Sequence, residues 1–221
     1  MAFRQTKTYD LLAALPLIVF YALATWGLWL RATAALKTAA ASGSILAALD
    51  AATFLATLFF IAFQAVLFTV RRQPLLFSPG WLPRAVAVAG ANFALAFVLV
   101  PRSDLPPVLH ALSAMLVVIG AAGSIWALSY LGRAFAILPQ ARQLAMRGPY
   151  AFVRHPLYLF ETIGMAGVML QFRQPWSLLI AAVTLALQLA RMHFEERLLS
   201  QTFPDYAGYA ARTARLIPHV Y

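Results

Sequence analysis

The sequence has no cysteine and few charged residues. Without cysteine, disulfides, thiolate metal sites and a cysteine nucleophile are excluded. Charged residues make up 11% of the 221 residues, whereas hydrophobic residues make up 62%. Because so few polar side chains cannot cover a soluble globule, we predict an all-α, polytopic integral membrane protein with no large soluble domain.

Acidic residues are scarce as well, and the 17 Lys and Arg give a net charge of +10. Such an excess can indicate a nucleic-acid partner, but in a membrane protein basic residues also set the orientation. On a six-span arrangement, thirteen of them fall near one face and four (Arg31, Lys37, Arg102 and Arg173) near the other. This asymmetry predicts both termini in the cytoplasm of a bacterial-type inner membrane, with no nucleic acid needed to explain the charge.

Six apolar stretches approach the length of about 20 residues that a transmembrane helix needs. They run over residues 11–30, 47–70, 83–100, 107–131, 157–172 and 175–192. We predict a four-helix transmembrane scaffold over residues 1–131. The last two stretches predict a helical hairpin within a functional region over 132–221, and the first arm of that hairpin, about 16 residues or roughly 24 Å, is short for a full crossing. The alanine-rich segment 32–41 is expected to be a loop or helix end.

Ionisable residues are concentrated in the last third of the chain. All three glutamates, Glu161, Glu195 and Glu196, lie there, whereas the first four spans are almost bare of charge. Burying a charge in lipid costs at least about 2.5 kcal/mol, so such residues usually face a polar cavity or a partner. The last third is therefore predicted to be the functional end.

Residues 154–158 predict the start of a helix that favours an anion. Pro156 suits the first turn of a helix, which places His155 at its cap. The N–H groups and dipole of such a terminus attract an anion, and Arg154 adds positive charge. Tyr158 and Glu161, three residues apart, share one face of this helix. Taken singly, these residues also have ordinary interpretations as a cap and an interfacial tyrosine.

Metal and dinucleotide motifs are missing from the sequence. His193 and Glu196 have the spacing of metal ligands, but a di-metal bundle site needs this pair twice, with further carboxylates. With four histidines in the chain, we predict no metal centre. There is no Gly-x-Gly-x-x-Gly, Walker, Gly-x-Ser-x-Gly or His-Glu-x-x-His motif, so a nucleotide cofactor would not be bound by a Rossmann domain.

Four segments, taken in order, resemble the C-terminal half of the isoprenylcysteine carboxyl methyltransferase family, whose cofactor signature the phospholipid methyltransferases share. They are Arg-Gly-Pro-Tyr at 147–150, Arg-His-Pro-Leu-Tyr at 154–158, the pair Glu195 and Glu196, and a terminal run with Tyr206, Tyr209, Arg212 and residues 215–218. The resemblance covers roughly residues 131–218. It implies a membrane methyltransferase that binds S-adenosylmethionine in a cytosol-facing pocket formed by the hairpin and the tail.

The resemblance also implies roles for individual residues. The implied cofactor contacts are Tyr150, Arg154, His155, Pro156, Tyr158, Glu195 and Glu196. Arg212 would hold an acceptor carboxylate, and Glu161 is a candidate base if the acceptor is an amine. The acceptor would be a lipid or lipidated small molecule, for instance an isoprenylcysteine-like carboxylate. The family usually has glycine where this chain has Phe160, which changes the expected shape of the pocket.

Two other classes of protein stay open on sequence grounds. Membrane reductases of the sterol or steroid type, which use NADPH, resemble this hairpin architecture and have a cofactor pocket on the same side. A non-enzymatic membrane subunit would instead use its basic face to bind anionic lipid. Cofactor binding separates the three, because the subunit would bind neither S-adenosylmethionine nor NADPH.

Overall fold

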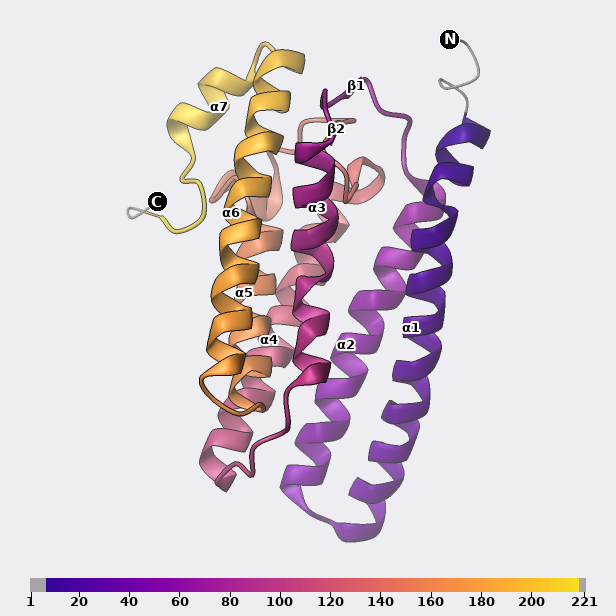
Figure 1. Ribbon diagram of the computed structural model, residues 1–221, viewed down its shortest axis with the longest axis vertical. Helices are drawn as coiled ribbons and strands as arrows, with labels where there is room; N and C mark the ends of the chain where they lie inside the picture. Colours follow the sequence, from indigo (N-terminus) through magenta and orange to yellow (C-terminus); the bar gives the residue numbers. More distant parts are fainter. Residues whose placement is uncertain (1–6, 219–221) are drawn as a thin grey trace.

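The computed structural model describes residues 7–218, and it is helical apart from one small strand pair (Figure 1). The helices are α1 (Lys7–Ser42), α2 (Ile45–Val70), α3 (Leu82–Asn92), α4 (Pro107–Leu131), α5 (Pro156–Leu170), α6 (Trp176–Thr202) and α7 (Tyr206–Arg212). Short 3-10 helices are η2 (Phe93–Leu99), η3 (Gly132–Ala134) and η4 (Gly148–Ala151). The strands β1 (Leu76–Phe77) and β2 (Gln140–Ala141) pair in antiparallel fashion. The predicted all-α fold is confirmed.

The predicted spans correspond to real helices, although some boundaries differ. Within residues 7–218, five segments are long and apolar enough to cross a membrane, and α5, with 15 residues, is a shorter apolar helix. Of the two expectations for residues 32–41, the loop is wrong and the helix end is correct, because these residues form the last turns of α1, which continues to Ser42. Alanine is the strongest helix former, and the helix stops only before Gly43, whose φ of 60° breaks it.

Helix α6 also runs further than predicted. The apolar stretch that predicts this span ends at Met192, but the helix α6 continues to Thr202 and ends shortly before Pro204. Glu195 and Glu196 therefore lie inside a helix, about two turns before its end. This position removes the unfavourable interaction with the helix dipole that a carboxylate at a C-terminus would have.

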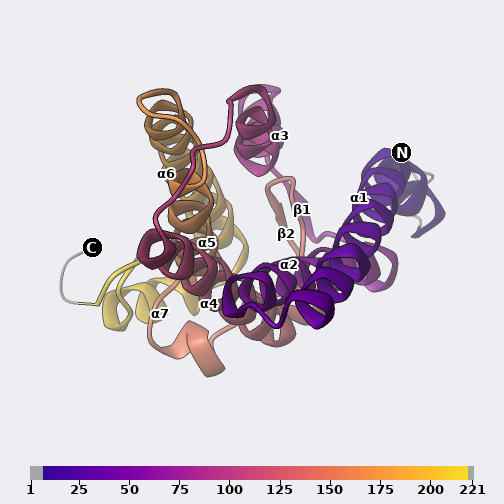
Figure 2. The ribbon, with the colours of Figure 1, turned by 90° about the horizontal axis from the view of Figure 1, so that it is seen from below.

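The helices form a curved row rather than a closed bundle. Helix α1 packs on α2, α2 on α4, α4 on α5, α5 on α6, and α6 on α3 and η2. Viewed along the helices, this row has the outline of a horseshoe, with α2 and α3 facing each other across its interior (Figure 2). The strand pair lies near one end of that interior. The fold thus encloses a space between these helices.

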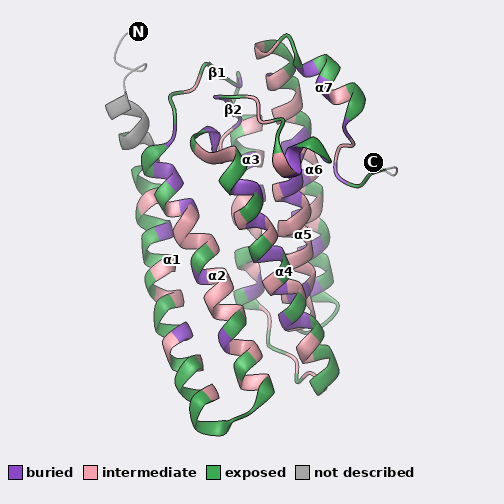
Figure 3. Cartoon of the chain, turned by 180° about the vertical axis from the view of Figure 1, so that it is seen from behind, coloured by how far each residue is buried: buried purple, intermediate pink, exposed green. Residues whose placement is uncertain are grey.

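The outer faces of the helices carry large apolar side chains that are exposed, as expected for contact with lipid. On α1, Leu23 is 66% exposed and Trp26 62% exposed, and at the end of η2 Leu99 is 85% exposed. Figure 3 shows exposed residues along much of α1, mostly intermediate ones along α2, and more buried ones among α4, α5 and α6. A soluble protein rarely exposes so much contiguous apolar surface, so this pattern supports a membrane setting.

Basic residues gather at one end of the bundle. The start of α1, the strand pair and α7 lie at this end (Figure 1), together with the loops that carry most of the arginines. Arg4, which belongs to the predicted basic face, lies outside the described residues. The cytoplasmic orientation of this end stays a prediction.

Small residues allow α4 and α5 to approach closely. A Cβ atom on Gly120 would lie 2.5 Å from both Cα and N of Gly164 and 2.7 Å from the carbonyl oxygen of Phe160. Close backbone approach at small residues is a common means of helix association in membranes. These contacts fix α5 against α4.

We expect Gly120→Ala to destabilise the protein by about 1–3 kcal/mol, because the added methyl meets backbone atoms that cannot move aside. The melting temperature in detergent measures this effect. Gly27→Ala on α1 is the matched control, since nothing lies within 4 Å of a Cβ there, and it should leave the melting temperature unchanged or slightly higher. Equal melting temperatures for the two variants would contradict the packing argument.

Candidate active site

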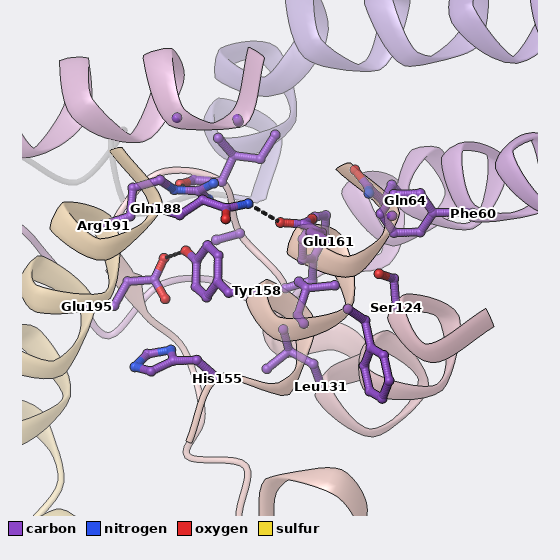
Figure 4. A pocket seen from close by; sticks show the side chains of 18 of the residues that line it. Phe60, Gln64, Ser124, Leu131, His155, Tyr158, Glu161, Gln188, Arg191 and Glu195 are labelled. Carbon is purple, nitrogen blue, oxygen red and sulfur yellow. Dashed lines mark hydrogen bonds between the residues drawn. The ribbon is translucent and has the colours of Figure 1, made fainter. Parts of the chain in front are cut away.

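A cavity of about 500 Å³ occupies the interior of the horseshoe. Side chains from α1 to α7, η2 and the segment 134–145 line it, so both the first four helices and the last third of the chain contribute. Figure 4 shows polar side chains that point into this space from several helices. A volume of this size is in the range of small-molecule and cofactor sites.

Helix α5 begins as the sequence predicts, with His155 at the N-cap and Pro156 as its first residue. The backbone before it is fixed by the C-terminal tail, since N–H of Arg154 donates to the carbonyl of Ala214 at 2.8 Å and N–H of His155 to that of Arg215 at 3.1 Å. His155 lines the cavity, whereas Pro156 is fully buried outside it. The C-terminal tail therefore fixes the chain segment at the start of α5.

Glu196 is the centre of an ionic cluster that fastens the tail. Its Oε1 accepts from Nε of Arg154 at 2.9 Å and lies 3.0 Å from Nε2 of His155, and its Oε2 lies 3.3 Å from Nε of Arg215. Arg154 also donates to the carbonyls of Ala210 (2.7 Å) and Thr213 (2.6 Å). Glu196 thus joins α6, the start of α5 and the tail, and it is not part of the cavity wall.

Glu195 has a different position from its neighbour. Its carboxylate lines the cavity and accepts a short hydrogen bond from the hydroxyl of Tyr158, which is buried in the same wall (Figure 4). The sequence treats Glu195 and Glu196 as a pair with one role. In the structure they divide, because consecutive helical residues point about 100° apart: Glu195 faces the ligand space and Glu196 faces the tail.

Three tyrosines outside the membrane-spanning helices close this end of the cavity. The hydroxyl of Tyr209 donates to the carbonyl of Tyr150 at 2.7 Å. The hydroxyls of Tyr150 and Tyr206 are buried and have no hydrogen-bond partner within residues 7–218. Burial raises the pKa of all three, that of Tyr209 to about 12. They therefore remain protonated at neutral pH, and two of them retain unused donors beside the cavity.

Arg191 is a cavity residue that sequence reasoning missed. It is 7% exposed, its guanidinium lies 5.0 Å from the ring centre of Tyr158, and its Nη2 makes a long contact of 3.4 Å with the carbonyl of Ile137. Its Nε has no hydrogen-bond partner in the described part of the chain. The stem packs against Gly90, where a Cβ would come within 2.7 Å of its Cδ.

The sequence gives little indication that Arg191 is a cavity residue. In the sequence it is one basic residue among several near a predicted helix end, and its helical spacing of four residues from Glu195 is compatible with a solvent-exposed pair. Only the packing of α3 on α6 makes it a buried cation. A buried guanidinium with an unpaired donor is ready to receive an anion.

Glu161 and Arg212, the two predicted catalytic residues, lie in different places. Glu161 lines the cavity and its Oε2 accepts from Nε2 of Gln188 at 3.3 Å (Figure 4). Arg212 is exposed on α7, its Nε donates to the carbonyl of Gly208 at 3.0 Å, and it is not among the residues that line the cavity. The structure therefore brings Glu161, and not Arg212, to the same space as Tyr158 and Glu195.

Phe160 occupies a position at which the sequence resemblance leads us to expect glycine. Its ring lies directly against Gly123 of α4, so close that a side chain there would collide with it, and it packs edge-to-face with Trp126. Gly123 thus provides the room that Phe160 requires. The ring forms part of the cavity wall without closing the cavity.

The fold defines a polytopic membrane protein whose helices surround an internal cavity. Residues 108–206 of this protein match the phospholipid methyltransferase family. The match begins in α4, includes α5 and α6, and ends at the first residue of α7. It confirms, over these residues, the resemblance to the phospholipid methyltransferases that the sequence predicts.

Two curated proteins are similar to parts of the chain. The nickel-cobalt-cadmium resistance protein NccN of Alcaligenes xylosoxydans xylosoxydans is 34% identical over 104 residues, which is 44% of this chain and 44% of the relative. The cobalt-zinc-cadmium resistance protein CzcN of Cupriavidus metallidurans is 33% identical over 120 residues, 52% of this chain and 51% of the relative. The chain spans about half the length of the curated relatives it matches.

Proposed function

We propose that the protein is an S-adenosylmethionine-dependent methyltransferase of the cytoplasmic membrane that methylates a carboxylate on a lipid-borne acceptor. The family match over residues 108–206 supports methyl transfer. The observation that carries the choice of acceptor is the buried Arg191, whose Nε is unpaired beside Tyr158 and Glu195.

The residues at the tyrosine-lined end of the cavity fit the proposed cofactor. S-adenosylmethionine, when bound, supplies an electrophilic methyl group. Its ammonium and ribose hydroxyls need acceptors, for which Glu195 is suited, and its carboxylate needs donors, which the start of α5 and the unused hydroxyls of Tyr150 and Tyr206 provide. His155 lies in the same wall. Arg154 and Glu196 hold the tail over this end, and Pro156 sets the start of α5.

Arg191 suits an acceptor carboxylate better than Arg212 does. A buried guanidinium can bind a carboxylate in a bidentate manner with little competition from water, whereas exposed Arg212 lies outside the cavity. A carboxylate is nucleophilic without losing a proton, so no general base is needed. Catalysis then rests on holding the two reactants in line in a space that excludes water.

The open side of the horseshoe gives the acceptor a route from the bilayer. The cavity extends from the polar end to Phe97 of η2 and Val168 of α5, among apolar side chains at membrane depth. Helix α3 packs on α6, while α2 packs on α1 and α4. A lipid chain can therefore lie between α2 and α3 while its head reaches Arg191.

A second candidate is methylation of an amine, because Glu161 also faces the cavity. An ammonium must lose a proton before it can attack, and a carboxylate within hydrogen-bond reach can accept that proton. The products distinguish the two reactions. A methyl ester releases methanol in base, whereas an N-methyl group does not.

Calorimetric titration with S-adenosylhomocysteine tests the cofactor. We expect saturable binding by the purified protein, loss of at least about tenfold in affinity for His155→Ala and for Glu195→Gln, and no binding of NADPH. The reason is that each variant removes one polar contact, which at a charged group is worth about 1.5–3 kcal/mol.

Folded protein that binds neither ligand would contradict the methyltransferase and favour a non-enzymatic membrane subunit. Binding of NADPH alone would favour a reductase. Asp50→Asn, which alters a carboxylate that pairs with His110 away from this cavity, is the matched control and should leave the affinity for S-adenosylhomocysteine unchanged.

A further inference from the structure

Glu161 is a membrane-depth carboxylate that the proposed reaction does not require. Its Oε2 accepts one long hydrogen bond of 3.3 Å from Gln188. The other oxygen accepts no hydrogen bond, and the side chain forms no ion pair, within residues 7–218. A carboxylate in such a place is costly unless it has a partner. In the described chain its partners are this hydrogen bond and the electrostatic attraction of Arg191, so one carboxylate oxygen keeps its hydrogen-bonding capacity toward the cavity.

Two further polar side chains of the same cavity have no hydrogen-bond partner in the described chain. The hydroxyl of Ser124 on α4 is buried, at 1% exposure, and has no hydrogen-bond partner in the described chain. Gln64 on α2 is buried as well, and its amide makes no hydrogen bond to any described residue. Both line the cavity with Glu161. Three helices thus present polar groups with unused hydrogen-bonding capacity to one space.

These groups lie on one side of Glu161. In Figure 4 Gln188 is on one side of the carboxylate, toward Arg191, and Gln64 and Ser124 are on the other. The α4–α5 contact supports this arrangement, because Phe160 lies against Gly123, and these are the sequence neighbours of Glu161 and Ser124. Gln188 is itself oriented by Thr162, whose hydroxyl lies 3.0 Å from its Oε1. Its N–H group therefore faces Glu161.

The chemistry of the three groups selects a particular ligand. An ionised carboxylate can only accept hydrogen bonds, and the amide oxygen and the hydroxyl can accept as well. A ligand group with several donors and a positive charge satisfies all three at once. An ammonium has three donors in a compact head, whereas a hydroxyl has one and a carboxylate none.

We propose that Glu161, Gln64 and Ser124 form a subsite for an ammonium group on the acceptor, so that the acceptor head carries both an amine and the carboxylate that Arg191 holds. This inference rests on the proposed function for the carboxylate. The substrate class is then an amphiphile with an amino-carboxylate head and one long apolar chain. Arg191 and Glu161 both line the cavity and attract each other electrostatically, which suits a zwitterion held between two opposite charges.

Three amphiphiles with the same chain test this subsite: 2-aminohexadecanoic acid, its N-acetyl derivative and hexadecanoic acid. Binding is measured with tritiated probes on protein in nanodiscs that is saturated with S-adenosylhomocysteine. We expect the amino acid to bind at least about tenfold more tightly than either other probe. Glu161→Gln should reduce this advantage to less than about threefold, and the control Asp50→Asn should retain it.

A wild-type protein that binds the three probes equally, or none of them, would overturn the subsite, as would an unchanged preference in Glu161→Gln. If Glu161→Gln does not fold, Gln64→Leu decides the matter, and we expect a reduced preference for the amino acid there too. Turnover with S-adenosylmethionine separates this inference from the function on which it rests. Selective binding without formation of a methanol-releasing ester supports the subsite and refutes carboxyl methylation.

Discussion

Replacing Arg191 by methionine is expected to lower kcat/KM for the acceptor by at least about 100-fold and to change the affinity for S-adenosylhomocysteine by less than about threefold. Methionine retains the packing of the stem against Gly90 but leaves the acceptor carboxylate without a cation. Removing one partner from a buried, hydrogen-bonded charge pair costs about 2–5 kcal/mol. Transfer of tritiated methyl groups to an acceptor, together with calorimetry, measures both quantities.

Arg212→Met is the matched control, because it is the same substitution at the arginine to which the sequence resemblance assigns the acceptor. Arg212 is exposed and its Nε donates to a carbonyl of its own helix. We therefore expect kcat/KM for the acceptor to change by less than about threefold in the Arg212→Met variant. A large loss in Arg212→Met with none in Arg191→Met would reverse the assignment. We expect Arg191→Lys to have more activity than Arg191→Met but less than the unmodified protein, since lysine cannot bind a carboxylate in a bidentate manner.

The helices were predictable from the sequence because lipid imposes a simple rule. A backbone in hydrocarbon must satisfy its own hydrogen bonds, so a long apolar stretch is a helix. Helix ends in water follow no such rule. Such helix ends depend on helix propensity and on the next helix-breaking residue. Helix α1 continues through residues 32–41 to the residue before Gly43. Helix α6 continues beyond Met192 and ends shortly before Pro204.

The order in which the helices pack was not predictable in the same way. The sequence suggests a hairpin of neighbouring helices at residues 157–192, yet α5 makes its most extensive contacts with α4. Those contacts depend on Gly120 and Gly164, which are 44 positions apart in the chain and become informative only when placed side by side. The horseshoe and its cavity follow from such long-range pairs.

The site was predictable where its residues are neighbours in the sequence. The start of α5 at Pro156 and the position of Tyr158 on its inner face follow from local rules. Arg191 and Gln64 could not be found in this way, because each has a cavity role only through packing of helices distant in the chain. For the same reason the sequence could not separate Glu195 from Glu196.

The ionic cluster around Glu196 leads to the second large effect. Glu196→Gln keeps the size of the side chain but removes the charge that Arg154, His155 and Arg215 share. Because hydrogen bonds to charged groups contribute about 1.5–3 kcal/mol each, we expect the tail to detach from α5 and α6 much more often. Tyr206 and Tyr209 would then leave the cavity wall. The affinity for S-adenosylhomocysteine should fall by about 10- to 100-fold, as measured by calorimetry.

Limited trypsin digestion tests the cause of that loss, with Glu195→Gln as the matched control one residue away. In Glu196→Gln we expect rapid cleavage after Arg212 and Arg215, because a detached tail is accessible to the protease. Glu195→Gln should also lose cofactor affinity, but with the cleavage pattern of the unmodified protein, since Glu195 bonds to Tyr158 and not to the tail. If the two variants are cleaved alike, Glu196 does not fasten the tail. If Glu196→Gln is cleaved rapidly and still binds the cofactor at full affinity, the tail does not contribute to the cofactor site.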